Sequence, residues 1–344
     1  MPATGSSTAT QSQIPRTPVP GTVLRIVPGL AVALAGALAA VGTAALIPGL
    51  SPLLVAIVLG IAARNMGLLP ERLAPGLAFA GRVPLRLGIV VLGLQLSLKD
   101  LASLGWGVPA LAVCVVVVGI LATVLLGRLL RVPRRQALLV ACGFSICGAA
   151  AVAGVESVVD ADEEETVTAV ALVVLFGTLM IPIVPVLAGL IGLDSRVGAV
   201  WAGASVHEVA QVVAVGGLLG GGALGVAVTV KLARVLMLAP VAAVLSWRQR
   251  RSGPAGGRRP PLVPLFVLGF VALVAVRSLM PLPAGALGAA SGVQAFLLTT
   301  AMFGLGAGVR IRSLVARGGR TLALAACSTL VVGTVGLVGA LAIA

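Results

Sequence analysis

The run GVPALAVCVVVVGILATVLLGRLL, residues 107–130, decides the class of fold, because it is apolar over the roughly 20 residues that a helix needs to cross a bilayer. Similar runs recur along all 344 residues. Hydrophobic residues make up 59% of the chain and charged residues 10%, whereas a soluble domain carries about 25% charged residues. Mean hydropathy is +1.16. A soluble core cannot hide this much apolar surface, so we predict an all-α polytopic membrane protein with lipid as its solvent.

Eleven apolar segments follow one another along the chain. They lie at about residues 27–47, 51–67, 82–98, 107–130, 136–158, 166–191, 196–217, 224–247, 262–280, 292–311 and 321–343. We therefore predict about eleven transmembrane helices in a single transporter domain, residues 22–344, with repeat-like halves at about 50–191 and 195–343. Residues 1–21 are rich in Ser, Thr and Pro and lack the apolar core of a signal peptide, which predicts a disordered cytoplasmic tail.

Basic residues concentrate in alternate loops between these segments, and this bias predicts the orientation. With the N-terminus in the cytoplasm, the inner loops carry most of the arginines, Arg196 included. The outer loops would then carry Lys99, Arg277 and the acidic run DADEEE, Asp160–Glu165. This pattern accounts for the net charge of +14 without nucleic acid as a partner, and it places the C-terminus in the periplasm.

The chain also repeats itself at a constant offset of 213 residues. LGLQLSLKDLASLGWGVPALAVCVVVV begins at Leu92 and GLGAGVRIRSLVARGGRTLALAACSTLVV begins at Gly304, so that Gly93 is paired with Gly306. Segments 2–4 thereby match segments 9–11, seven crossings later, and the two copies point in opposite directions. Inverted repeats are a common plan of secondary transporters. The alternative is chance similarity between helices rich in Ala, Val and Gly.

A second match has an offset of 60 residues. SICGAAAVAG, Ser145–Gly154, resembles SVHEVAQVVA, Ser205–Ala214. If each stretch belongs to a helix that crosses the membrane, the two copies lie an even number of crossings apart and point the same way. This conflicts with a simple inverted repeat unless a crossing is miscounted or the likeness is fortuitous.

The stretch SVHEVAQ places His207, Glu208 and Gln211 within an apolar segment, and His207 is the only histidine of the chain. An ionised group at mid-bilayer costs roughly 2.5 kcal/mol or more on insertion scales, so such residues usually line a cavity or a proton relay. A structural hydrogen bond between helices is the alternative. HEVAQ lacks the second histidine of the zinc motif HExxH, so we predict neither a metal site nor an enzyme.

Two further stretches complete the candidate site. The small residues of Ser145–Gly154 predict a helix that is broken near Cys147–Gly148 and offers backbone groups to a ligand; close helix packing is the alternative. In VKLARVLMLAP, two cations share one face of an apolar helix and need neutralisation by Glu208, by a bound anion or by both. The predicted substrate- and ion-binding residues are Ser145, Cys147, Gly148, Ser205, His207, Glu208, Gln211, Lys231 and Arg234.

The segments CGFSICGAAAVAGVESVV, GASVHEVAQVVAVGG and VKLARVLMLAPV resemble signature segments of the YeiH family of bacterial inner-membrane proteins, often labelled a sulfate exporter family. The likeness covers residues 22–344. More distantly, the chain is similar to bile-acid/sodium symporter-type folds, which have inverted five-helix repeats and discontinuous helices that cross near sodium ions. That resemblance implies a helix at Glu208 and Gln211 that could bear a cation site.

Together these observations predict a secondary transporter that moves a small anion, sulfate or a related sulfur oxyanion or organic anion, across the bacterial inner membrane. Coupling to Na⁺ or H⁺ through Glu208 and His207 is expected, without a cofactor. An anion channel and a non-transporting membrane scaffold or sensor are the alternatives. The expected partners are the lipid bilayer and the anionic substrate, and a homo-oligomer is compatible with the sequence.

Overall fold

The computed structural model describes residues 20–46, 51–252, 264–311 and 319–343, and within these ranges the chain is helical without β-strands. The predicted tail, residues 1–21, lies almost entirely outside the described residues. So do four of the basic positions used to predict the orientation, namely Arg258, Arg259, Arg312 and Arg317.

Helix occupies each of the eleven predicted segments. The elements are α1 (Pro20–Leu46), α2 (Pro52–Asn65), η1 (Glu71–Leu73), α3 (Ala74–Leu92), η2 (Gly93–Gln95), α4 (Leu98–Ser103), α5 (Gly107–Leu129), α6 (Arg134–Cys142), η3 (Gly143–Cys147), α7 (Ala149–Val159), α8 (Glu163–Ile191), α9 (Ser195–Ser205), α10 (Val209–Leu219), α11 (Ala223–Leu236), α12 (Leu238–Ser252), α13 (Leu265–Leu279), α14 (Ala284–Gly306) and α16 (Gly319–Ile343).

Seven helical stretches among the described residues are long and apolar enough to cross a membrane. They are Leu24–Leu46, Glu71–Gln95, Gly107–Leu129, Glu164–Ile191, Ala223–Arg251, Ala284–Gly306 and Gly319–Ile343, and three shorter apolar helices are Pro52–Asn65, Val209–Leu219 and Leu265–Leu279. The chain is therefore a polytopic helical membrane protein, as its composition predicts.

The prediction that segment 136–158 crosses the membrane is wrong, because α6, η3 and α7 form a hairpin (hairpin 1). A Cβ atom on Gly143 would lie 2.9 Å from a Val152 methyl group, although nine residues separate the two positions. At the opposite, open end of the hairpin, Arg135 forms an ion pair of 3.2 Å with Asp160. A straight helix would hold both pairs far apart at about 1.5 Å per residue, so the chain must reverse between them.

The segment predicted at 196–217 is also a hairpin rather than a crossing (hairpin 2, α9 and α10). A Cβ atom on Gly198, near the start of α9, would lie 3.5 Å from Leu219 at the end of α10. Just beyond, a Cβ atom on Gly221 would lie 2.8 Å from the hydroxyl oxygen of Ser195. The start and the end of this hairpin are therefore at the same end of the helix bundle.

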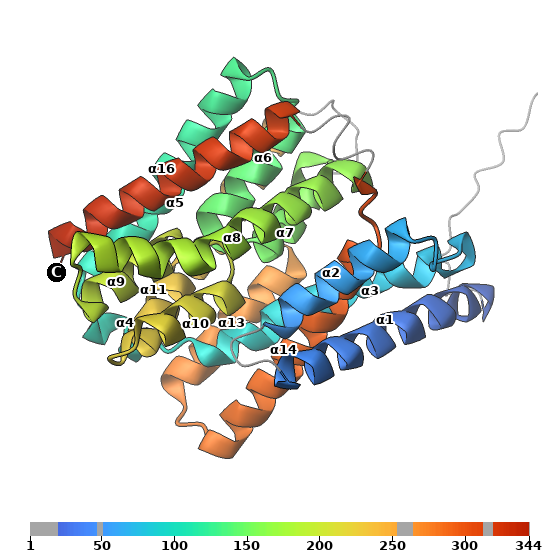
Figure 1. Cartoon of the computed structure of the whole chain (residues 1–344), viewed down its shortest axis with the longest axis horizontal. Helices are drawn as coiled ribbons and strands as arrows, with labels where there is room; N and C mark the ends of the chain where they lie inside the picture. Colours follow the sequence, from blue (N-terminus) through green and yellow to red (C-terminus); the bar gives the residue numbers. More distant parts are fainter. Residues whose placement is uncertain (1–19, 47–50, 253–263, 312–318, 344) are drawn as a thin grey trace, which may run out of the picture.

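The two hairpins enter the bundle from opposite ends, because α8 connects them. This helix has 29 residues and spans about 43 Å, with hairpin 1 before its first residue and hairpin 2 after its last (Figure 1). Two predictions about loops are corrected as a result. The acidic run Asp160–Glu165 lies at the end of the bundle that carries Arg135, and Arg196 lies at the other end.

The remaining helices form two groups. Figure 1 shows α1, α2, α3 and α14 side by side, and α13 packs on α3 in the same group. Helices α5, α8, α11 and α16 surround the hairpins in the second group. Glycines allow close approach within the first group, as expected for membrane helices. A Cβ atom on Gly306 of α14 would overlap the carbonyl oxygen of Ile57 in α2, and one on Gly93 would overlap the carbonyl oxygen of Phe270 in α13.

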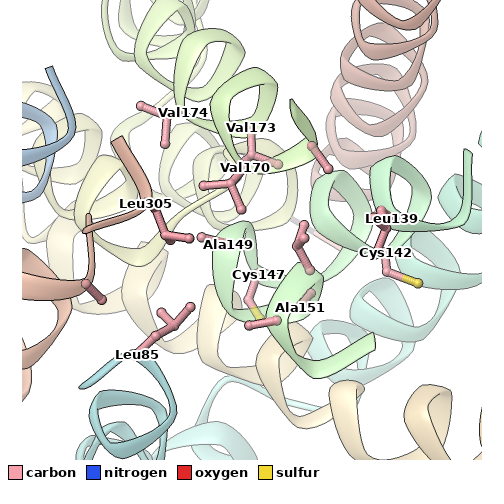
Figure 2. Close-up of a cluster of buried hydrophobic side chains, with 14 of the residues drawn as sticks. Leu85, Leu139, Cys142, Cys147, Ala149, Ala151, Val170, Val173, Val174 and Leu305 are labelled. Atoms are coloured by element: carbon pink, nitrogen blue, oxygen red, sulfur yellow. The ribbon is translucent and has the colours of Figure 1, made fainter. Parts of the chain in front are cut away.

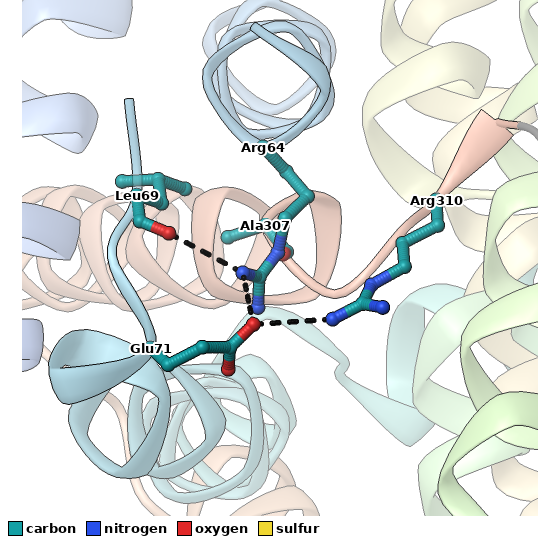
Figure 3. A network of polar contacts seen from close by, with 5 residues as sticks. All are labelled: Arg64, Leu69, Glu71, Ala307 and Arg310. Carbon is teal, nitrogen blue, oxygen red and sulfur yellow. Dashed lines mark hydrogen bonds and ion pairs between the residues drawn. The ribbon is translucent and has the colours of Figure 1, made fainter. Parts of the chain in front are cut away.

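A polar network fixes α2 to the end of α14 (Figure 3). It lies at the end of the bundle that carries Arg64, Arg135 and Arg310, which we call the basic end. The Arg64 guanidinium donates to the carbonyl oxygen of Ala307 at 2.7 Å and reaches Glu71 at 3.4 Å. Arg310 binds the same Glu71 oxygen at 3.1 Å. Arg64 therefore fixes the end of α2 to the end of α14 by both backbone and carboxylate contacts.

The core around hairpin 1 is apolar and joins the two groups. Figure 2 shows Cys147, Ala149 and Ala151 between α8 and α3, which contribute Val173 and Leu85. All five side chains are buried. Small residues on the hairpin allow the neighbouring helices to pack against its backbone, which brings that backbone to the centre of the molecule.

Candidate functional site

The two hairpins touch at their turns, which we call tip 1 (Phe144–Ala149) and tip 2 (Ser205–Val209). The backbone N–H of Ala149, at the N-terminus of α7, donates to Glu208 Oε1 at 3.2 Å. On the other side of the contact, His207 Nδ1 lies 3.3 Å from the carbonyl oxygen of Phe144. Because a carbonyl oxygen only accepts, Nδ1 carries the proton in this contact. The structure thus brings together the two stretches that the sequence singled out.

Gly148 makes the turn of tip 1 and confirms the predicted break near Cys147–Gly148. Its φ of 73° and ψ of −136° belong to a region that glycine alone adopts readily. Its lack of a side chain also makes room for hairpin 2, since a Cβ atom would overlap Glu208 Cγ and lie 2.9 Å from Oε1. Both the backbone turn and the carboxylate contact therefore require glycine at this position.

Lys231 and Arg234, one turn apart on α11, bind the backbone of both tips. Lys231 Nζ donates to the carbonyl oxygens of Ile146 at 3.0 Å and Val206 at 2.8 Å. Arg234 makes four hydrogen bonds, all to carbonyl oxygens. These acceptors are Phe144 at 2.9 Å, Ser145 at 3.1 Å, Gly203 at 3.3 Å and Val206 at 3.1 Å. The two cations thus cap the ends of η3 and α9, where carbonyl groups lack helical partners.

Both cationic side chains are fully buried, with 0% exposure. Among the described residues, no carboxylate lies within 4.0 Å of either nitrogen group, so the salt bridge to Glu208 that the sequence left open is not formed. Instead, the partial negative charges at two helix C-termini stabilise them. With one carboxylate and two cations, the tips keep a net positive charge when all three groups are ionised.

The other predicted residues support the tips rather than form an open site. His207 Nε2 lies 3.1 Å from the Thr329 hydroxyl on α16, and the ring packs on Phe144 with centroids 4.5 Å apart. Gln211 Oε1 accepts from the Glu208 N–H at 3.0 Å, which caps α10. The Ser205 hydroxyl donates to the carbonyl oxygen of Trp201 at 2.6 Å. The Ser145 hydroxyl is buried and has no hydrogen-bond partner among the described residues.

A cavity of about 550 Å³ lies between the two helix groups, with both tips at its floor. Cys147, Ala149 and Glu208 line the floor and are buried, whereas Leu218 and Ser291 line the mouth and are exposed. From Glu208 to Leu218 the wall is α10, which gives a depth of about 15 Å. The mouth therefore opens at the end from which hairpin 2 enters.

The cavity wall includes two of the nine predicted site residues, Cys147 and Glu208, and adds a pair that sequence reasoning missed. Gln95 Nε2 donates to Gln294 Oε1 at 2.6 Å and so links η2 to α14 beside the cavity. In the sequence, Gln95 lies near the end of the predicted segment 82–98. Its only sequence signal is an uncharged amide in an apolar segment, and Gln294 carries the same signal. The rest of the wall is mostly apolar and comes from α3, α10 and α14.

Comparison with known proteins shows relatives along almost the whole chain. A family model described as "Conserved hypothetical protein 698" matches residues 25–325. The UPF0324 membrane protein Cgl0015/cg0018 of Corynebacterium glutamicum is 54% identical over 323 residues, which are 93% of this chain and 94% of that protein. The UPF0324 membrane protein PA5383 of Pseudomonas aeruginosa is 39% identical, over 88% of this chain and 90% of that protein.

A third relative, the UPF0324 membrane protein TauZ of Paracoccus pantotrophus, is 37% identical over 82% of this chain and 85% of its own length. No solved structure matches the chain. The family model and these relatives agree with the resemblance to YeiH carried by the two hairpin segments and α11. The chain therefore belongs to the UPF0324 family of membrane proteins.

Proposed function

We propose that this protein is a secondary transporter that moves a small anion across the bacterial inner membrane, with the cavity as its binding site. One observation carries the proposal: two hairpins enter from opposite ends and meet at the floor of a cavity that opens toward one end. Discontinuous helices that meet near the bilayer midplane are typical of transporter binding sites, where irregular backbone lines a cavity.

The proposal includes an inverted repeat of five elements in permuted order. The first copy comprises α2, α3, α5, hairpin 1 and α8. The second comprises hairpin 2, α11, α13, α14 and α16. Hairpin 1 and hairpin 2 point in opposite directions, which removes the conflict raised by the match at an offset of 60. The conflict arises only if the segments at 136–158 and 196–217 are single crossings, and both are hairpins.

Equivalent contacts support this repeat. Gly306 approaches Ile57, and Gly93 approaches Phe270. The offset of 213 pairs Gly93 with Gly306 and Ile57 with Phe270, so the two contacts are equivalent. At the tips, Lys231 binds the carbonyl oxygens of Ile146 and Val206, which the offset of 60 relates. A repeat that matched only in composition would not be expected to reproduce contacts of this kind.

The closed end of the cavity supports alternating access. Between α3 and α7, Arg86 forms a 3.1 Å ion pair with Glu156, and the neighbouring space measures only about 30 Å³. The open mouth lies at the opposite end. With the basic end in the cytoplasm, the structure corresponds to a state that is open to the periplasm, and a transport cycle would close the mouth and open the path beside Arg86.

The charge and shape of the site favour an organic anion over bare sulfate. Lys231 and Arg234 make the tips net positive, and the N-termini of α7 and α10 present the positive ends of two helix dipoles to the cavity floor. The cavity has the volume of pockets that hold drug-sized ligands, and much of its wall is apolar. A carboxylate or sulfonate with an apolar body would contact both the floor and the wall.

Glu208 is the proposed coupling residue. It is the acidic side chain that lines the cavity in the described part of the chain, and it is 8% exposed. Proton uptake at its carboxylate would remove a negative charge from the floor where the anion binds. Anion binding and protonation would then favour each other, which is the linkage that proton-coupled transport requires.

Counterflow in proteoliposomes tests the proposal. Liposomes preloaded with unlabelled sulfate, sulfite, a small sulfonate or a small carboxylate are diluted into the same labelled anion, with and without sodium and a pH gradient. A transporter gives saturable accumulation that requires the internal anion. A conductance that does not saturate and responds to voltage would indicate the channel alternative. No flux with any of these anions would contradict the proposal.

A further inference from the structure

The backbone carbonyls at the meeting point of the tips form two clusters that would suit a cation. The end of η3 contributes Phe144, Ser145 and Ile146, and the end of α9 contributes Gly203 and Val206. Carbonyl groups at helix C-termini lack helical partners and carry partial negative charge. In transporters with discontinuous helices, such carbonyls coordinate coupling ions such as Na⁺.

In this protein, side-chain nitrogen atoms already donate hydrogen bonds to these carbonyl oxygens. Six hydrogen bonds of 2.8–3.3 Å run from Lys231 and Arg234 to the five oxygens. The Lys231 ammonium bridges Ile146 and Val206, which are equivalent positions of the two hairpins. A metal ion at this point would have to displace a donor from its oxygens and would meet repulsion from two buried cations.

We infer that Lys231 and Arg234 are tethered cations that replace exchangeable metal ions at the meeting point of the tips. They hold the two hairpins together without an exchangeable ion, since a covalently attached ammonium or guanidinium group cannot diffuse away from the protein. The fold then requires no sodium ion at the tips. Insofar as the proposed function holds, transport requires none there either, and the ion that moves with the substrate must bind elsewhere, as a proton on Glu208 would.

Thermal unfolding of the purified full chain tests this inference without any transport measurement. The midpoint is measured in choline chloride, NaCl, LiCl and KCl at equal ionic strength. The wild-type chain is expected to unfold at the same temperature in all four salts. A rise of about 2–4 °C or more that is specific to Na⁺ or Li⁺ would overturn the inference, because a ligand that binds only the folded state raises the midpoint.

Chemical rescue gives a second arm. Lys231→Ala leaves the carbonyl oxygens of Ile146 and Val206 without their shared donor, so its midpoint should fall in choline. Methylammonium, Na⁺ or Li⁺ should raise it again, while Lys99→Ala, at an exposed lysine, should respond to none of them. Lys231→Arg should keep most of the wild-type stability in choline. If Lys231→Ala does not fold, the result for the wild-type chain alone decides.

The two proposals can fail separately. Absence of counterflow with every anion would contradict the transporter proposal. It would not affect the tethered-cation inference, which is tested by the thermal unfolding midpoint. Sodium-specific stabilisation of the wild-type chain would end the tethered-cation inference and leave transport open. In the transport assay, saturable counterflow in sodium-free choline buffer supports the inference, and a requirement for sodium together with sodium-specific stabilisation of the wild-type chain contradicts it.

Discussion

The two hairpin tips touch each other but differ in backbone and in chemistry, since φ is 73° at Gly148 and −116° at Glu208. At equivalent positions, tip 1 has Cys147 and Gly148 where tip 2 has His207 and Glu208. Tip 1 contributes backbone, with one N–H donated to the carboxylate of Glu208. Tip 2 contributes side chains that fill the space left by Gly148. The polar side chains of His207 and Glu208 thus lie on tip 2, and Gly148 of tip 1 leaves the room that Glu208 needs.

This comparison depends on the two hairpins entering the bundle from opposite ends. Labelling of single cysteines from each side of the membrane tests that arrangement. In a chain without native cysteines, Glu164→Cys should react with an impermeant maleimide from the cytoplasmic side only, and Arg196→Cys from the periplasmic side only. Lys99→Cys is the periplasmic control. If segments 136–158 and 196–217 each cross the membrane instead, Glu164→Cys reacts from the periplasmic side and Arg196→Cys from the cytoplasmic side.

The capping of both tips by one residue predicts the largest loss of stability. Arg234→Met removes four hydrogen bonds to carbonyl oxygens and should cost about 3–5 kcal/mol of unfolding free energy, the range for breaking a buried charged network. The measurement is thermal or denaturant unfolding in detergent, with Arg196→Met as an exposed control. A loss similar to that of the control would show that the tips hold without this cap.

Replacement of Gly148 in tip 1 should lower stability for two separate reasons. Gly148→Ala introduces backbone strain of about 1–3 kcal/mol and an overlap with Glu208. Gly220→Ala introduces the strain alone, since φ is 66° there and none of the described residues lies within 4 Å of a Cβ atom. Unfolding midpoints should therefore fall further for Gly148→Ala. The double variant Gly148→Ala/Glu208→Ala should recover the difference, and failure to recover it would contradict the fit between the tips.

The chemistry of tip 2 predicts a functional effect with little loss of fold. Glu208→Gln keeps an oxygen for the Ala149 N–H but removes the charge that can titrate. Proton-driven uptake should fall at least about tenfold, equivalent to about 1.4 kcal/mol, while counterflow and the unfolding midpoint change little. Asp100→Asn, at the exposed start of α4, should leave uptake unchanged. Normal gradient-driven uptake by well-folded Glu208→Gln protein would refute the coupling role.

The smallest effect concerns the cavity wall beyond the tips. Gln95→Leu or Gln294→Leu leaves the other amide without its partner and should cost about 1–3 kcal/mol, whereas the double variant should cost less than either single one. The double-mutant cycle on unfolding free energies measures this coupling. Strictly additive losses would show that the 2.6 Å contact contributes nothing to stability.

The sequence alone determined the class of the protein and much of its site. Composition requires a membrane environment, and helix occupies every apolar segment that we predicted, because backbone groups in lipid have to be satisfied within the helix. The motifs identified the family and placed the tips and α11 in one site, since polar residues in an apolar segment are costly unless they have partners. The break near Gly148 was also predicted from small residues.

Only the tertiary structure showed that two of the predicted segments are hairpins. A hairpin of two short apolar helices has the same length and composition as one straight span, so the contacts of Gly143 with Val152 and of Gly198 with Leu219 had to distinguish them. The roles of Lys231 and Arg234 also became clear only from the tertiary structure. Their hydrogen-bond acceptors are backbone carbonyl oxygens, which every residue carries, so the sequence does not show which ones they bind. The Gln95–Gln294 pair joins positions 199 residues apart, and proximity of that kind arises only when the helices pack.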